Sequence, residues 1–118
     1  KEVNIIAHSC GVHMLMSYIK NNNLSSKIKS IVLIGAGAVD KGQDLIYQYP
    51  YGRISIPVLD IFGEYDFNLV IRKSSERRQI IKNISSKSKQ IEIKASNHYH
   101  DDNFLEVLDN VKKWLSSQ

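Results

Sequence analysis

The stretch from Val3 to Ile19, VNIIAHSCGVHMLMSYI, decides the fold. Its first residues form a short apolar run with β-branched side chains, which predicts a strand over residues 3–9. From Gly11 onward, apolar side chains recur at helical spacing, which predicts a helix over residues 11–22; they are Val12, Leu15, Met16 and Ile19. A strand that passes into a helix through so short a turn is typical of α/β proteins.

The rest of the chain repeats this alternation. Residues 28–37, 56–66 and 89–96 read as strands, and residues 69–84 and 103–115 as helices, with an irregular segment over residues 38–53. Strands that alternate with helices predict a mostly parallel sheet with helices on both faces. We therefore expect residues 1–118 to form a single α/β domain, with any site at the carboxyl ends of the strands.

Composition narrows the classes of function. The chain has 118 residues, 42% hydrophobic and 24% charged, with a formal net charge of +4, as in an ordinary globular domain. The densest basic cluster, residues 72–78 (RKSSERR), has no interleaved aromatic side chains and reads as a solvated helix face, so we expect no nucleic-acid partner. One cysteine rules out an internal disulfide. No apolar run reaches membrane-spanning length. No signal peptide is visible, but the first residues already read as the middle of a fold, so the localisation stays unknown, with the cytoplasm as the default.

The turn after the first strand has the pattern of a nucleophile elbow. A serine that projects from a sharp strand–helix turn crowds the positions two before and two after it, and here these are Ala7 and Gly11 around Ser9. The following helix points its N-terminus at this turn, so the backbone N–H of Cys10 is the candidate oxyanion donor. The Cys10 thiol is the alternative nucleophile, but His8 and Val12 would then fill the crowded positions. Otherwise Cys10 is a small residue that faces the core.

Partners for Ser9 follow two later strands. A serine needs a base that takes its proton, and the base needs an orienting carboxylate. Asp66 ends the third predicted strand and His98 follows the fourth, so these are the candidate acid and base. Asp60, Glu64 and His100 are weaker alternatives. Asp101 and Asp102 are expected to cap the last helix, and His8 is expected to line the substrate site. The alternative to a catalytic role is that Ser9, Asp66 and His98 are ordinary turn and cap residues.

The stretches IIAHSCG, IPVLDIFGEYD and KASNHYHDD…VKKWL together resemble the C-terminal half of an α/β-hydrolase, in which the order is serine, acid, histidine. The closest resemblance is to an uncharacterised bacterial branch of that superfamily. It implies a serine hydrolase that cleaves a carboxylic ester, thioester or amide of a small-molecule acyl substrate through Ser9, His98 and Asp66. It implies no cofactor and no metal. The alternative is a non-catalytic binding or assembly domain on the same scaffold.

The same resemblance implies strands before the elbow strand and a loop that supplies a second oxyanion donor. We expect residues 3–7 to form an apolar sheet edge that pairs with another copy or with a missing N-terminal half. We also expect the chain alone to hydrolyse esters poorly, since losing one oxyanion donor lowers the rate about 100- to 1,000-fold. In the irregular segment, a large lid is not expected. There, Tyr47, Tyr49 and Tyr51 either line a cleft or simply pack.

Overall fold

Four parallel strands form the sheet of this protein, in the order β1-β2-β3-β4. The computed structural model describes residues 1–38 and 48–118. The strands are β1 (Val3–His8), β2 (Ile28–Ile34), β3 (Val58–Tyr65) and β4 (Lys89–Asn97). Each neighbouring pair is parallel, so all four strands bring their carboxyl ends to the same edge of the sheet.

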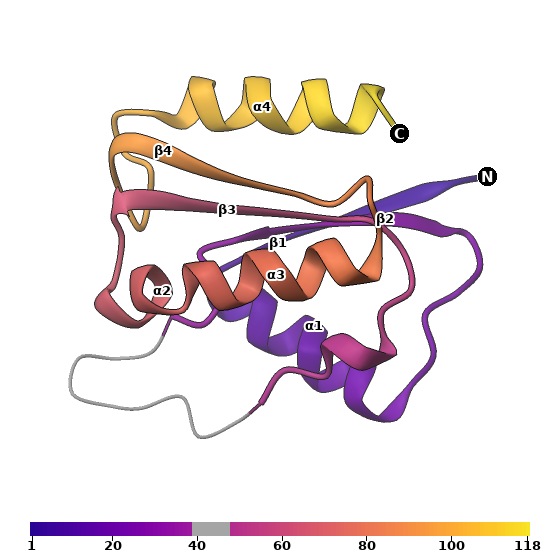
Figure 1. Cartoon of the computed structure of the whole chain (residues 1–118). Coiled ribbons are helices and arrows are strands. Elements are labelled where there is room, and N and C mark those ends of the chain that lie inside the picture. Colours follow the sequence, from indigo (N-terminus) through magenta and orange to yellow (C-terminus); the bar gives the residue numbers. More distant parts are fainter. Residues whose placement is uncertain (39–47) are drawn as a thin grey trace.

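Helices cover both faces of this sheet (Figure 1). One face carries α1 (Cys10–Asn21), α2 (Asn68–Arg72) and α3 (Ser74–Ile84), and the other carries α4 (Phe104–Ser116). A short 3-10 turn, η1 (Tyr51–Arg53), packs beside α3. The α/β architecture expected from the sequence is confirmed. The single helix expected over residues 69–84 is wrong in detail, because the chain leaves helical geometry at Lys73 and forms two helices.

Three apolar clusters fill the spaces between the sheet and its helices, and the two larger ones lie on opposite faces of the sheet. Successive side chains of β2 point to opposite faces of the sheet and so contribute to both of these clusters. Ile31 and Leu33 point to the α1 side, and Val32 points to the α4 side. On the α1 side they meet Val12, Met16, Ile19 and Ile81. On the α4 side the sheet meets Val107, Val111 and Trp114. The strand-to-helix pattern of Val3–Ile19 is thus anchored by burial of the whole apolar face of α1.

Helix α4 buries a narrower stripe than its sequence predicts. Phe104 and Leu105, which share the helical spacing of Leu108, Val111 and Trp114 in the sequence, are 64% and 77% exposed. The residues of α4 that pack against the sheet are Val107, Val111, Trp114 and, partly buried, Leu115, so the contact begins three residues into the helix. The expected caps are also wrong, because α4 begins after Asn103. Asp101 instead accepts a hydrogen bond from the Asn97 side chain, 3.0 Å away.

A buried ion pair ties α3 to the middle of the sheet. Arg77, placed by the sequence on a solvated face, is 5% exposed, and its Nε lies 3.1 Å from both carboxylate oxygens of Asp60. Its Nη1 donates to the Val70 carbonyl oxygen at 2.7 Å, and Gln90 donates to Asp60 at 2.8 Å. Asp60 is therefore engaged in the core, which removes it as an alternative acid. Removing one member of such a pair typically destabilises a fold by about 3–5 kcal/mol.

Strand β1 forms an edge of the described sheet and pairs only with β2. Its apolar side chains Val3 and Ile6 are 45% and 56% exposed. This agrees with the apolar edge expected from the sequence.

Among the helices of residues 1–38 and 48–118, none combines the length and apolar character that a membrane crossing requires.

Candidate active site

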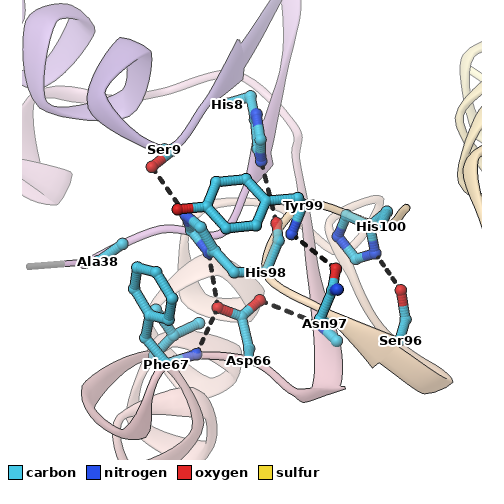
Figure 2. Close-up of polar contacts among 12 residues, drawn as sticks. His8, Ser9, Ala38, Asp66, Phe67, Ser96, Asn97, His98, Tyr99 and His100 are labelled. Atoms are coloured by element: carbon cyan, nitrogen blue, oxygen red, sulfur yellow. Dashed lines mark hydrogen bonds and ion pairs between the residues drawn. The ribbon is translucent and has the colours of Figure 1, made fainter. Parts of the chain in front are cut away.

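Three strands bring the predicted residues to one edge of the sheet. Ser9 follows β1, Asp66 follows β3 and His98 follows β4. Because all strands run in parallel, these positions lie together at the carboxyl edge, although up to 89 residues separate them in sequence. Figure 2 shows the imidazole of His98 between the Ser9 hydroxyl and the Asp66 carboxylate.

The backbone at Ser9 has the strained form that an elbow requires. Ser9 has φ 55° and ψ −114°, a conformation that a residue with a side chain rarely adopts. A hydrogen bond from Ser9 N–H to the Ile34 carbonyl oxygen, at 2.9 Å, holds the turn against β2. A Cβ placed on Gly11 would lie 3.9 Å from the Cβ of Ala7. The two positions that the sequence marks as crowded therefore do face each other beneath Ser9.

A continuous line of hydrogen bonds joins the three side chains. The Ser9 Oγ lies 2.7 Å from His98 Nε2, and His98 Nδ1 lies 2.7 Å from Asp66 Oδ1. A carboxylate only accepts, so Nδ1–H donates to Asp66, and Nε2 is left to accept the Ser9 hydroxyl proton. His98 is 1% exposed and Asp66 is 7% exposed. This arrangement can take a proton from Ser9 and hold it on a buried imidazole.

Asp66 is held in its ionised form by its surroundings. Burial by itself would raise the pKa of this carboxyl, but three hydrogen bonds to it outweigh burial and bring the pKa below its ordinary value. They come from His98, from Gly63 N–H at 3.1 Å and from Phe67 N–H at 2.8 Å. Asp66 is therefore a carboxylate throughout the neutral range, as an orienting group for an imidazole must be.

The other histidines are turned to different partners. His8, expected to line the substrate site, is exposed and its Nε2 donates to the backbone oxygen of His98 at 3.1 Å. His100 is 4% exposed, and its Nδ1 lies 2.6 Å from Ser96 Oγ. Burial lowers the pKa of His100. His13 lies 2.6 Å from both the Ala38 carbonyl oxygen and the Tyr49 hydroxyl. Of the four histidines, all within the described residues, His98 is the one whose ring is hydrogen-bonded to the Ser9 hydroxyl.

Cys10 opens helix α1, and its side chain is exposed. The expectation that Cys10 faces the core is therefore wrong, because the first turn of α1 directs this side chain outward. The amides of a first helical turn have no acceptor within the helix, so Cys10 N–H is suited to receive a negative oxygen beside Ser9.

Three residues at the site were not found from the sequence. Gly35, at the end of β2, has φ +67°, and a Cβ there would lie 2.6 Å from His98 Cε1. The Phe67 ring stacks on the imidazole of His98, with centroids 4.1 Å apart. The Tyr99 ring stands edge-on to the same imidazole at 5.1 Å. A glycine at the end of an apolar strand is a sequence signal that could have identified Gly35. Nothing in the sequence indicates that the rings of Phe67 and Tyr99 pack on His98.

A cavity of about 640 Å³ lies between the loop that follows β2, η1 and helices α2 and α3, and none of Ser9, Asp66 and His98 lines it. Its lining includes Ala36, Gly37, Leu69, Tyr49 and Tyr51. Two of the three tyrosines considered from the sequence thus line a hollow, and Tyr47 lies outside the described residues. Within residues 1–38 and 48–118, no group of three or more His, Cys, Asp or Glu side chains is placed to hold a metal ion.

The fold belongs to the class of α/β folds that solved esterases have. Est1E from Butyrivibrio proteoclasticus matches over 99% of this chain with a TM-score of 0.71 and 13% sequence identity. The esterase domain of a Rhodothermus marinus protein matches over 85% of it with a TM-score of 0.58 and 12% identity. The chain spans 61% of the first structure's length and 54% of the second's. No protein-family model matches the chain, and no curated protein matches it by sequence.

Proposed function

We propose that this chain is the catalytic part of a serine hydrolase of the α/β-hydrolase type, which cleaves a carboxylic ester, thioester or amide of a small acyl substrate. The observation that carries the proposal is the line of two 2.7 Å hydrogen bonds from Ser9 through His98 to Asp66. The strained backbone of Ser9 and the esterase folds of the two structural neighbours support it.

In this proposal Ser9 Oγ attacks the carbonyl carbon of the substrate while His98 Nε2 takes its proton. The carbonyl oxygen becomes negative and receives a hydrogen bond from Cys10 N–H. The bond to the leaving group then breaks, and His98 returns the proton to that group, which leaves an acyl group on Ser9. Water, activated by the same imidazole, releases the acid. Asp66 stays ionised and stabilises the imidazolium, and His8 holds the backbone that carries His98. No cofactor takes part.

Covalent labelling tests this proposal directly. A fluorophosphonate probe reacts with a serine whose hydroxyl is activated by a neighbouring base. We expect one adduct per chain, located on Ser9 by peptide mass spectrometry. Cys10→Ala is the matched control, because it changes the adjacent side chain and keeps the backbone N–H; it should label like the unchanged protein. A label elsewhere, or one that persists in Ser9→Ala, contradicts the proposal, and absence of any label favours a non-catalytic scaffold.

We further propose that the open edge of β1 is covered by a strand from another copy of the chain or from an N-terminal half that completes the sheet. Backbone N–H and C=O groups along an open apolar edge pair readily with another strand. Each such group left buried without a partner destabilises a protein by about 1–3 kcal/mol. An N-terminal half would also supply a second oxyanion donor, so the chain by itself should turn over esters slowly.

Sedimentation of the isolated chain tests the edge. We expect its average mass to rise with concentration, and we expect Ile6→Lys, which places a charge on the exposed edge residue, to shift it to monomer. Lys112→Glu, at an exposed position of α4 and outside β1, is the control for a general charge effect. A monomer at all concentrations, with slow amide exchange along Val3–Ala7, would disprove pairing at this edge.

A further inference from the structure

Two aromatic side chains, Phe67 and Tyr99, pack against His98, the proposed general base of the candidate active site. Phe67 follows Asp66 in the chain and Tyr99 follows His98, so both come from the loops that position the acid and the base. The Phe67 ring stacks on the imidazole with an interplanar angle of 21°, and Tyr99 stands across both rings at 77° and 82°. Figure 2 shows the three rings grouped beside Ser9.

These two rings remain open to solvent. His98 is only 1% exposed, whereas Phe67 is 37% exposed and Tyr99 is 62% exposed. Neither ring belongs to the apolar clusters that fill the core. The apolar part of the surface around His98 is therefore formed by Phe67 and Tyr99, and the exposed ring of His8, 5.4 Å from the imidazole, adds a polar part. Apolar side chains grouped on a surface mark a binding site more often than scattered ones do.

The proposed reaction places one part of the substrate against this surface. The leaving-group atom must come within hydrogen-bond distance of His98 Nε2, about 2.6–3.2 Å, to receive the proton. The carbonyl oxygen must lie instead toward Cys10 N–H, at the start of α1. Since the Phe67 and Tyr99 rings both contact the His98 ring, a group attached to the leaving atom comes within reach of them.

We infer that Phe67 and Tyr99 form a leaving-group subsite, which selects esters whose alcohol part is a flat apolar ring. This inference rests on the proposed function. A benzyl ester is the simplest such substrate. The bond between its acyl carbon and its alkoxy oxygen breaks, that oxygen takes the proton from His98, and benzyl alcohol leaves while the acyl group stays on Ser9. The ring of the alcohol packs edge-to-face with Tyr99 and against the open part of Phe67.

A pair of acetate esters tests the subsite. Benzyl acetate and ethyl acetate give the same acyl-enzyme, so the ratio of their kcat/KM values reports the leaving group alone. An aromatic contact corresponds to about a 10-fold preference. We expect Tyr99→Ala and Phe67→Leu each to lower this ratio toward one, and Tyr99→Phe to keep it. Tyr18→Ala, which removes a comparably exposed tyrosine from α1, should leave it unchanged. A ratio that stays the same in both Tyr99→Ala and Phe67→Leu overturns the inference.

Binding of benzyl alcohol separates this inference from the proposed function. In Ser9→Ala protein, which cannot turn over, we expect benzyl alcohol to shift the NMR signals of the Phe67 and Tyr99 rings in a saturable way, and ethanol to leave them in place. Shifts at both rings without any fluorophosphonate label on Ser9 would uphold the binding subsite and refute the hydrolase. A labelled Ser9 with no ring shift up to the solubility limit of benzyl alcohol would refute the subsite alone.

Discussion

Replacing His98 with alanine is expected to slow the fluorophosphonate labelling of Ser9 by about 10²–10⁴-fold, the range that a positioned general base contributes. The reason is that His98 Nε2, at 2.7 Å, is the basic atom that contacts Ser9 Oγ. Without it, the serine proton can pass only to water. The rate constant of labelling is measured by mass spectrometry, which reports the chemistry even if ester turnover is slow.

His100 provides the matched comparison, because it lies two residues further along the chain. Its Nδ1 faces Ser96 Oγ, and burial lowers its pKa. His100→Asn keeps a polar group toward Ser96, and we expect it to label within about threefold of the unchanged protein, since the side chain that it replaces is hydrogen-bonded to Ser96 and not to Ser9. Circular dichroism of both variants shows whether each is folded. Fast labelling of folded His98→Ala together with slow labelling of His100→Asn would reverse the assignment.

The features that the sequence predicted well are those set by local geometry or by strand direction. The small side chains of Ala7 and Gly11 fit the pattern of such a turn, so they single out Ser9 without any knowledge of the rest of the fold. Asp66 and His98 could be chosen because parallel strands end at one edge, and each residue lies just beyond a strand. The choice of His98 over His100 agrees with the contacts in the structure; the role of either residue stays a prediction.

The features that the sequence did not predict depend on packing between distant segments. Arg77 lies in a run of charged residues, and only its position over Asp60, which is 17 residues earlier, turns it into the core. The exposure of Leu105 follows from the way α4 meets the sheet through Val107 and Val111. In the same way, the stacking of Phe67 on His98 requires the loops after β3 and β4 to meet. No periodicity within one segment carries that information.

Gly35→Ala is expected to disable the candidate active site, although Gly35 follows β2, and Ser9, Asp66 and His98 follow the other three strands. A Cβ at this position would lie 2.6 Å from His98 Cε1 and 2.9 Å from His98 Nδ1, closer than real Cβ atoms approach other atoms. The imidazole is held by Asp66 on one side and by the Phe67 ring on its face, so it cannot yield without losing one of these contacts. The methyl group therefore displaces the base from Ser9.

The expected decrease in the labelling rate follows from the displacement of the His98 imidazole. Moving a reacting group by about 1 Å lowers the rate about 100-fold, so labelling of Ser9 in Gly35→Ala should slow by at least about that factor. The left-handed backbone of Gly35, φ +67°, adds strain of about 1–2 kcal/mol to the folded state, which thermal unfolding measures separately. Gly52→Ala is the control, because a Cβ there meets no atom within 4 Å. If folded Gly35→Ala labels as fast as Gly52→Ala, then the imidazole does not need this position, and Gly35 serves only the turn after β2.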